Sequence, residues 1–354
     1  MAGQFELGSK HIECMKVANQ NLREAQDINP KETAKKLIEK TYGFLPSESH
    51  VYDDYLGLTV ALEEISKISS DAASVIADQV LIREIFKAYG NNNASEVLNS
   101  KETIGLLCSE SGLTSISNIS TKAIRNNGQW TITGKKQIYN EQLSSDSYLV
   151  FAQDEEGLIR LFILNSDQLN INTINKNIAS SKVSLTQAII DVTINETAHV
   201  GVISDEFEHV QTVARTVIAA TSIGIAHSAL IASIGVAKEV KNDEGQAISS
   251  SQNIQFTLAD MFAEIEASRM LTYFSANSID ENKSNIKIAT MAKVKASDIA
   301  AKSSIDALHI LGNIGYIANT EFANVVLRAV DNQVKGGTNR TQMSKIYKYM
   351  LAKK

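Results

Sequence analysis

A stretch of 22 residues without a formal charge, between Arg215 and Lys238, most constrains what this chain can fold into. The stretch reads TVIAATSIGIAHSALIASIGVA and, as a helix, is long enough to cross a bilayer. It carries three Ser, two Thr, one His and many Ala, so its transfer into lipid is far weaker than that of a Leu/Val/Ile segment. We therefore expect a buried helix of a soluble helical bundle and no membrane span, with a membrane element as the alternative.

The spacing of apolar residues changes twice along the chain. From about residue 30 to residue 99, segments such as YLGLTVALEEISKI have apolar residues three and four positions apart, which is typical of helices. From about 104 to 202, short Thr/Ile/Val-rich runs are separated by NNGQ and DEEG, which indicate hairpin turns. From Phe207 onward the helical spacing returns, and the two prolines, Pro30 and Pro46, lie far upstream. The predicted α+β fold has an N-terminal helical domain at 1–103, a middle β domain at 104–205 and a C-terminal helical bundle at 206–354.

Composition excludes several classes of protein. The 354 residues are 44% hydrophobic and 21% charged, which is ordinary for a globular protein and wrong for a disordered one. The net charge is −6 and no cluster of Lys and Arg stands out, so nucleic-acid binding is disfavoured. The two cysteines, Cys14 and Cys108, have no Cys/His spacing that would hold a metal. We expect no metal site and a reducing, cytoplasmic setting.

Five segments, taken in order, resemble the motifs of one enzyme family. TVALEEISKIS is similar to a helix with a paired acidic centre, and LLCSESGLTSI resembles the loop T-E-P-G-A-G-S. ITGKKQIYNEQLSSDSYLVFA resembles the strand pair L-N-G-x-K-x-W-I-T-N, and QNIQFTLADMFAEIEASRML resembles a Q-x-x-x-x-x-L-A-x-M helix. AKVKASDIAAKSSIDALHILGNIGY is similar to a helix that ends in Q-x-x-G-G-x-G. These motifs, at this spacing, resemble the acyl-CoA dehydrogenase superfamily, which implies a C-terminal four-helix bundle.

The resemblance implies a flavin-dependent oxidoreductase that acts on the CH–CH group of an acyl-CoA, a reaction of fatty acid metabolism. In this reaction a carboxylate removes the α proton, and the base must lie within hydrogen-bond reach of it. The family motif Y-E-G-T falls on KGGT, so the position of the base is Gly336. Some members carry the glutamate before the arginine that opens the bundle, and here that position is Ala214, followed by Arg215. The usual catalytic residue is therefore missing at both positions.

The resemblance also assigns positions to the cofactor and the substrate. The cofactor positions are Ser109, Asn140, Lys241, Gln252, Gly312 and Thr338, and the substrate positions are Ser115 and Arg215. Lys241 replaces an arginine that reaches the FAD pyrophosphate of a neighbouring subunit, and Glu244 replaces a phenylalanine near the adenine. A carboxylate there would repel the pyrophosphate. Asn313 replaces a glycine of the same region, and we expect FAD to bind weakly or not at all.

Several residues in these motifs also have a purely structural interpretation. Gly336 and Gly337 can form a tight turn after a helix, because glycine accepts positive φ angles. His309 lies in an apolar stretch and is expected as a hydrogen-bonded core histidine. The pair at positions 63–64, in ALEEISKI, fits a solvated helix face, and His227 fits a packing residue with one polar contact.

Three functions follow from these observations. The first is a homologue that binds an acyl thioester without the standard reaction, alone or as the non-catalytic subunit of a mixed assembly. The second is a flavin-dependent monooxygenase of the same fold, because such members also lack the glutamate. The third is an active FAD-dependent dehydrogenase with an unusual base, for which Glu141 is a poor candidate. We favour the first and expect a homo- or hetero-oligomer.

Overall fold

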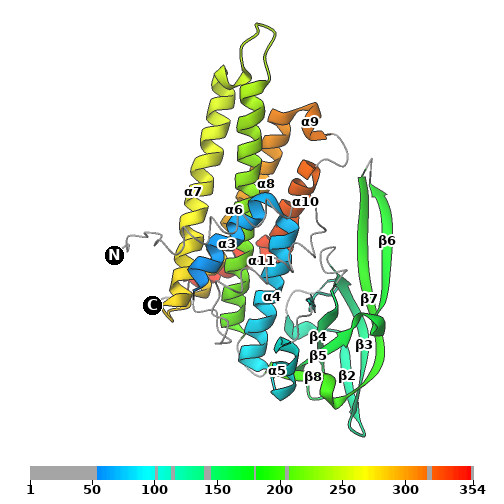
Figure 1. Cartoon of the computed structure of the whole chain (residues 1–354). Coiled ribbons are helices and arrows are strands. Elements are labelled where there is room, and N and C mark those ends of the chain that lie inside the picture. The colour runs from blue at the N-terminus through cyan, green and yellow to red at the C-terminus, as the bar shows by residue number, and fades with distance from the viewer. Residues whose placement is uncertain are drawn as a thin grey trace. The chain divides into compact units, whose positions relative to one another are not determined.

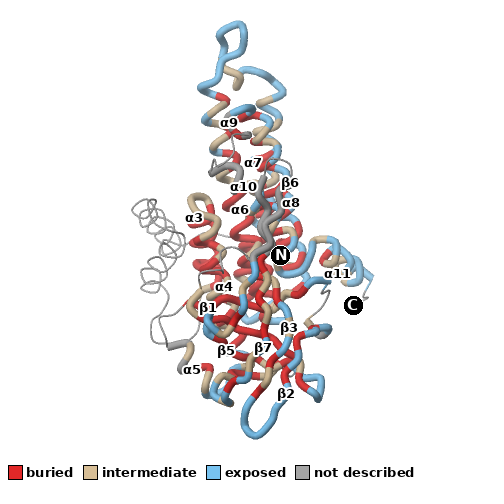
Figure 2. Tube along the Cα trace, turned by 90° about the vertical axis from the view of Figure 1, so that its right-hand side faces the viewer, coloured by how far each residue is buried: buried red, intermediate tan, exposed pale blue. Residues whose placement is uncertain are grey.

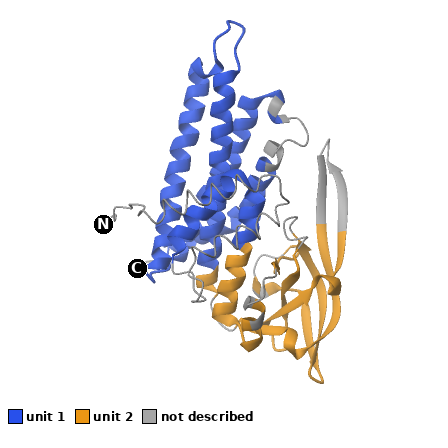
Figure 3. Cartoon of the chain, viewed as in Figure 1, with its two compact units in different colours: residues 1–77, 211–354 blue, residues 78–210 orange. Residues whose placement is uncertain are grey.

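The chain folds into an α+β structure with two compact units (Figure 3). The computed structural model describes residues 54–99, 103–112, 116–138, 145–178, 181–203, 207–316 and 321–351. One unit contains Asp78–Val210, and the other combines Met1–Ala77 with Gln211–Lys354. The further division into three domains along the sequence stays a prediction.

A single mixed sheet forms most of the unit at 78–210 (Figure 1). Its eight described strands are β1 (Ile104–Leu107), β2 (Lys122–Asn126), β3 (Gln129–Ile138), β4 (Ser147–Gln153), β5 (Ile159–Asn165), β6 (Asn170–Ile178), β7 (Ser181–Asn195) and β8 (His199–Ile203). Seven of them lie in the order β6-β7-β3-β2-β4-β5-β8, and β1 pairs with β4 in parallel. The short helix α5 (Asn92–Asn99) belongs to the same unit.

The two hairpin turns that the sequence predicts are present. Asn127 and Gly128 join β2 to β3, and both have positive φ angles, 49° and 79°. Two positive φ angles at the centre of a two-residue turn suit the twist of the flanking strands. Gly157, with a φ of 84°, lies between β4 and β5. The β-rich character of this region is thus confirmed.

Long helices form the unit at 1–77 and 211–354 (Figure 1). The helices are α3 (Tyr55–Ile68), α6 (Glu208–Glu239), α7 (Gln252–Asp280), α8 (Ile286–Leu311), α9 (Asn313–Tyr316), α10 (Glu321–Val334) and α11 (Asn339–Leu351). Helix α4 (Ser70–Tyr89) begins in this unit and ends in the other. The core between α6, α7, α8 and α10 is built from small and branched side chains, with Ile223, Met261 and Ala296 among its fully buried members.

Helix α6 contains the uncharged stretch. It is long and apolar enough to cross a membrane, but 67% of its most apolar window is buried within the protein. Figure 2 shows buried residues along this helix. At Gly224 a Cβ atom would lie 2.4 Å from the backbone oxygen of Glu63, so only glycine allows α3 to approach this closely. Ser66 on α3 donates to the Thr221 carbonyl of α6 at 2.7 Å. Helix α6 is therefore a buried core helix.

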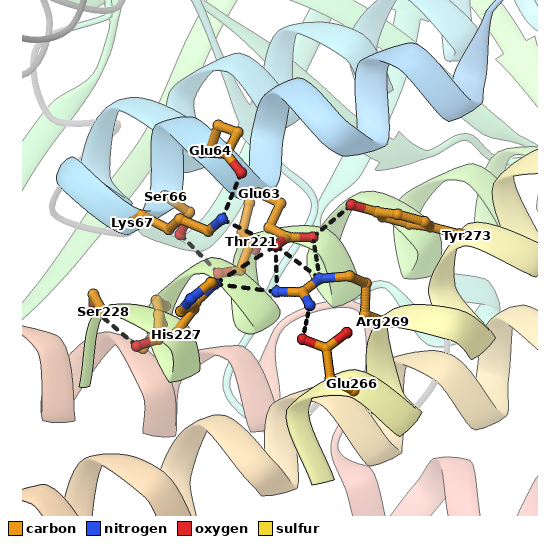
Figure 4. A network of polar contacts seen from close by, with 11 residues as sticks. Glu63, Glu64, Ser66, Lys67, Thr221, His227, Ser228, Glu266, Arg269 and Tyr273 are labelled. Carbon is orange, nitrogen blue, oxygen red and sulfur yellow. Dashed lines mark hydrogen bonds and ion pairs between the residues drawn. The ribbon is translucent and has the colours of Figure 1, made fainter. Parts of the chain in front are cut away.

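A buried polar network joins α3, α6 and α7 (Figure 4). The Glu63 carboxylate accepts hydrogen bonds from Arg269 Nε at 3.0 Å and from Tyr273 Oη at 2.9 Å. Arg269 Nη2 also lies 3.1 Å from His227 Nδ1, so this half-buried histidine has a polar contact, as predicted. The predicted solvated helix face at 63–64 is wrong, because Glu63 is 1% exposed and Glu64 is 4% exposed. Cationic partners allow this burial, because Arg269 of α7 pairs with Glu63 and Lys67 of α3 pairs with both glutamates.

Candidate functional site

The loop between α10 and α11 is a tight turn built on two glycines. Helix α10 ends at Val334, and Gly336 and Gly337 follow with φ angles of 65° and 94°. This left-handed backbone is the conformation in which glycine is strongly preferred. Thr338 Oγ1 then accepts a hydrogen bond from the Thr341 amide at 3.2 Å, at the start of α11. The structural expectation of a turn after a helix is confirmed.

The two positions where a catalytic glutamate was expected converge on one face of α6. A Cβ atom at Gly336 would lie 2.7 Å from Ile218 Cδ1. Ile218 lies one helical turn after Ala214, and residues four apart share one face of a helix. Ala214 is buried. Gly336 and Ala214, the positions that the resemblance assigns to the base, therefore both lie by this part of α6, and neither has a side chain that can take a proton.

Lys293 on α8 forms hydrogen bonds at both ends of the loop. Its side chain is fully buried. The Nζ atom donates to the Gln333 carbonyl at 3.0 Å, to the Gly337 carbonyl at 2.9 Å and to Asn339 Oδ1 at 2.6 Å. An ammonium group has three N–H donors and no acceptor, so these three bonds satisfy it.

Asp298, on the same helix, accepts hydrogen bonds from two of the residues that Lys293 contacts. Its Oδ1 atom accepts from Gln333 Nε2 and from Asn339 Nδ2, both at 2.7 Å. Ser297 Oγ adds a bond with Asn339 Nδ2 at 2.9 Å. We call Lys293, Ser297 and Asp298 the α8 clamp. Sequence reasoning missed the clamp, although Lys293 shares a helix face with Ala289 and Ala296, which are both fully buried.

Two opposite charges act on Lys293. Burial lowers the pKa of Lys293, Asp298 raises it and Arg215 lowers it further, and the result is a pKa of about 7. Arg215, from α6, is 2% exposed and donates to Thr290 Oγ1 at 2.8 Å and to Gln211 Oε1 at 2.9 Å. The predicted substrate residue Arg215 thus lies in the same region of the bundle as the clamp.

Ser109 lies in the other unit, on the segment after β1. Its carbonyl accepts from the Gln137 amide at 2.9 Å, which ties the segment to β3. The next residue, Glu110, is buried and accepts from Lys136 Nζ at 2.7 Å. Burial raises the pKa of Glu110, but hydrogen bonds from Lys136, Ser120 and Thr121 outweigh it and hold the pKa at about 2. Three candidate site residues lie outside the described residues, namely Ser115, Asn140 and Glu141, and so do Cys14, Pro30 and Pro46.

The remaining predicted cofactor residues lie at exposed ends of helices. Lys241 and Glu244 are exposed in the turn after α6, where Asn242 Oδ1 accepts from the Glu244 amide at 3.1 Å. Gln252 is the exposed first residue of α7. Gly312 ends α8 with a φ of 55°. Lys241 follows Ile218 of α6 by about six helical turns. The exposed residues Lys241, Gln252 and Gly312 therefore do not form one cluster with Thr338.

One structural expectation for this region is wrong. His309 is exposed in the last turn of α8 and is not a core histidine. The apolar residues around it, such as Ile310 and Leu311, point to the buried side of the helix instead. An apolar neighbourhood in sequence does not bury every residue of a helix, because neighbours along the chain lie about 100° apart around the axis.

A family model and a relative of similar length point to one family. The family model described as "Acyl-CoA dehydrogenase, C-terminal domain" matches residues 208–351. An acyl-CoA dehydrogenase of Bacillus subtilis (strain 168) is 28% identical over 316 residues, which are 84% of this chain and 83% of the relative.

Solved structures show the same fold. Butyryl-CoA dehydrogenase from Megasphaera elsdenii aligns with a TM-score of 0.82 at 24% identity and covers 99% of this chain and 100% of its own. A glutaryl-CoA dehydrogenase from Mycobacterium smegmatis, solved in complex with FADH2, aligns with a TM-score of 0.83 at 17% identity, covering 98% and 96%. The family model, the relative from Bacillus subtilis and the shared fold together support a place in the acyl-CoA dehydrogenase superfamily.

Proposed function

We propose that this protein binds an acyl thioester without dehydrogenating it, as a non-catalytic homologue or as the non-catalytic subunit of a mixed assembly. The main support is the convergence of Gly336 and Ala214 on one face of α6, next to Ile218. The α C–H of a thioester is a weak acid, so its removal needs a base within hydrogen-bond reach. Neither a hydrogen nor a methyl group can serve as that base.

The two lysines at the loop do not replace the glutamate in this proposal. Lys293 Nζ is already engaged by three acceptors on or beside the loop, which gives it a structural role there. Lys335, next to Gly336, donates from Nζ to Ser74 Oγ of α4 at 2.6 Å. Both side chains support the loop, which favours a binding role over a catalytic one.

We also propose that FAD binds weakly or not at all. FAD would supply the hydride acceptor when bound, and the family relationship makes it the expected cofactor. The residues expected at the adenine end of FAD fit the cofactor poorly. Lys241 is an exposed lysine, and lysine cannot bind a phosphate through two parallel hydrogen bonds as arginine does. Glu244, three residues later in the same exposed turn, brings a negative charge toward the pyrophosphate.

A cytoplasmic location fits the chain. Cys108 is a free cysteine, and burial raises the pKa of its thiol. A raised pKa makes a thiol less reactive, and free cysteines are usual in a reducing compartment. We propose the cytoplasm as the location.

Calorimetry and absorbance test the proposed function together. The purified full chain should be colourless near 450 nm and should bind butanoyl-CoA with saturable heat, more tightly than free CoA. With FAD and an artificial electron acceptor added in excess, no turnover is expected. A rate of about 1 to 10³ per second, the ordinary range for enzymes, would contradict the proposal.

The flavin measurement separates the alternatives. A dissociation constant for oxidised FAD tighter than about 1 μM, about 8 kcal/mol of binding, would favour an active dehydrogenase whose base lies elsewhere. Flavin that binds only in its reduced form would favour a monooxygenase. Heat with free CoA equal to that with butanoyl-CoA would count against an acyl site.

A further inference from the structure

The loop from Val334 to Thr338 covers the buried amine of Lys293, which holds it by hydrogen bonds. Lys293 Nζ lies under the loop, and its three acceptors belong to Gln333, Gly337 and Asn339, which are on or beside it. Asn339 is held from both sides, because its Oδ1 accepts from Lys293 and its Nδ2 donates to Asp298. When the loop lifts, Lys293 loses these acceptors and its amine meets water.

We propose that Lys293 is a positioning residue that keeps the loop from Val334 to Thr338 closed, and that opening of this loop takes up a proton at Lys293. Among the described residues, no carboxylate forms an ion pair with Lys293. The amine therefore depends on neutral acceptors for as long as the loop is closed, and a buried charge without an ionic partner is costly. Water removes that cost when the loop opens.

The charges that face Lys293 set the direction of the pH dependence. Asp298 from α8 favours the charged form and Arg215 from α6 opposes it, while the contacts from α10 and α11 are neutral. In the closed state the pKa of Lys293 is about 7, mainly because of burial, and in the open state it returns toward its ordinary value of 10.5. Between these two values the open state binds more protons, so opening becomes harder as the pH rises.

Hydrogen exchange of the full chain, without ligand, measures the opening. The amides of Lys335 and Gln342 are hydrogen-bonded in the closed loop, to the carbonyls of Asp331 and Thr338. Exchange of the peptide 331–342 should be followed between pH 7.5 and 9 and divided by the exchange of an unstructured peptide of the same sequence. One coupled proton changes the protection about tenfold per pH unit, so we expect protection to rise at least about tenfold over this range.

Three variants separate the effect of the clamp on loop opening from an effect on the stability of the whole chain. Lys293→Met should lower the protection and remove its pH dependence. Lys302→Met is the matched control, because Lys302 is an exposed lysine of α8 that pairs with Asp260, and it should behave as wild type. Asn339→Leu keeps Lys293 and removes one of its acceptors, so it should lower the protection and keep the pH dependence. This variant still tests the inference if Lys293→Met does not fold.

Several outcomes would overturn the inference. A wild-type protection that stays flat or falls as the pH rises would exclude coupled proton uptake. A folded Lys293→Met chain with wild-type protection would exclude the clamp, and unchanged protection in Asn339→Leu would exclude the three-acceptor arrangement. None of these results bears on thioester binding, so the inference and the proposed function fail independently.

Discussion

At the scale of single residues, position 336 combines a missing carboxylate with a backbone that disfavours one. A left-handed φ costs a residue with a side chain about 1–2 kcal/mol. A Cβ atom there also meets Ile218 Cδ1 at 2.7 Å, although this is the flexible end of a side chain. Lys335, which also donates to Ser74, carries a positive charge that would help to keep a new carboxylate ionised. Restoring a base at Gly336 therefore needs space as well as charge.

We expect Gly336→Glu alone to be destabilised by about 1–2 kcal/mol and to show little activity. In the double variant Gly336→Glu/Ile218→Ala, the shortened side chain on α6 makes room for the carboxylate. A positioned base contributes about 10²- to 10⁴-fold, so turnover of butanoyl-CoA with saturating FAD should rise well above wild type. The matched control is Gly336→Gln/Ile218→Ala, which has the same shape without a base. Equal rates in the two double variants would show that position 336 is not where the α proton is taken.

At the scale of elements, α3 is tied to α7 by a carboxylate that is buried at the centre of the network. Burial raises the pKa of Glu63, but the nearby His227 side chain, the hydrogen bonds from Arg269 and the charges of Arg269 and Lys67 outweigh it and hold the pKa at about 2, against 4.5 for the free side chain. The difference corresponds to about 3 kcal/mol of stability. Because the folded pKa is lowered, this contribution is complete above pH 4.5 and is lost as the pH falls toward 2.

Denaturant titrations should therefore show Glu63→Gln less stable than wild type by about 3 kcal/mol at pH 7, since it leaves Arg269 buried with a weaker partner. The difference should shrink as the pH falls below 4.5, because the unfolded wild-type chain then binds a proton at Glu63 that the folded chain does not bind. Glu239→Gln is the control, at an exposed glutamate in the last turn of α6, and should match wild type throughout. A stability difference that stays constant from pH 7 to pH 3 would rule out the charge of Glu63 as its cause.

At the scale of the whole molecule, α7 exposes an apolar stripe along its length. Residues at helical spacing on one face are Phe256, Ala259, Ala263, Ala267, Met270 and Phe274, and all are exposed. Phe256 is 65% exposed and Met270 is 55% exposed. A contiguous apolar stripe of this length on a soluble protein marks an interaction surface. We expect a second copy of this chain, or a homologous chain, to cover it.

Light scattering after gel filtration should give a mass of at least two chains for wild type. The double variant Phe256→Lys/Met270→Lys places two charges in the stripe and should shift the protein toward the monomer of 38.6 kDa. Leu327→Lys is the control, because Leu327 is 61% exposed on another helix, α10, and it should leave the mass unchanged. A monomeric wild-type protein, or an unaltered mass in the double variant, would contradict this use of the stripe.

Local patterns determined the class of the fold. The change from helical to alternating spacing near residue 104 and back near 207 matches β1 at Ile104 and α6 at Glu208, because side-chain periodicity is a property of the chain itself. The pair Asn127–Gly128 predicted the β2–β3 turn, since the backbone of that turn needs those residue types. The resemblance to family motifs likewise used residues at fixed spacing, and it led to the turn at Gly336.

Contacts between distant segments were decided by tertiary structure alone. Glu63 is buried because Arg269, about two hundred residues later, brings a charge to it. The convergence of Gly336 with α6 and the burial of Lys293 under the loop depend on how α6, α8 and α10 pack. Helical spacing shows that a residue lies on a face, but it does not show which segment covers that face or what partner that segment supplies. For a charged residue, that partner decides whether it is solvated, paired or used as a clamp.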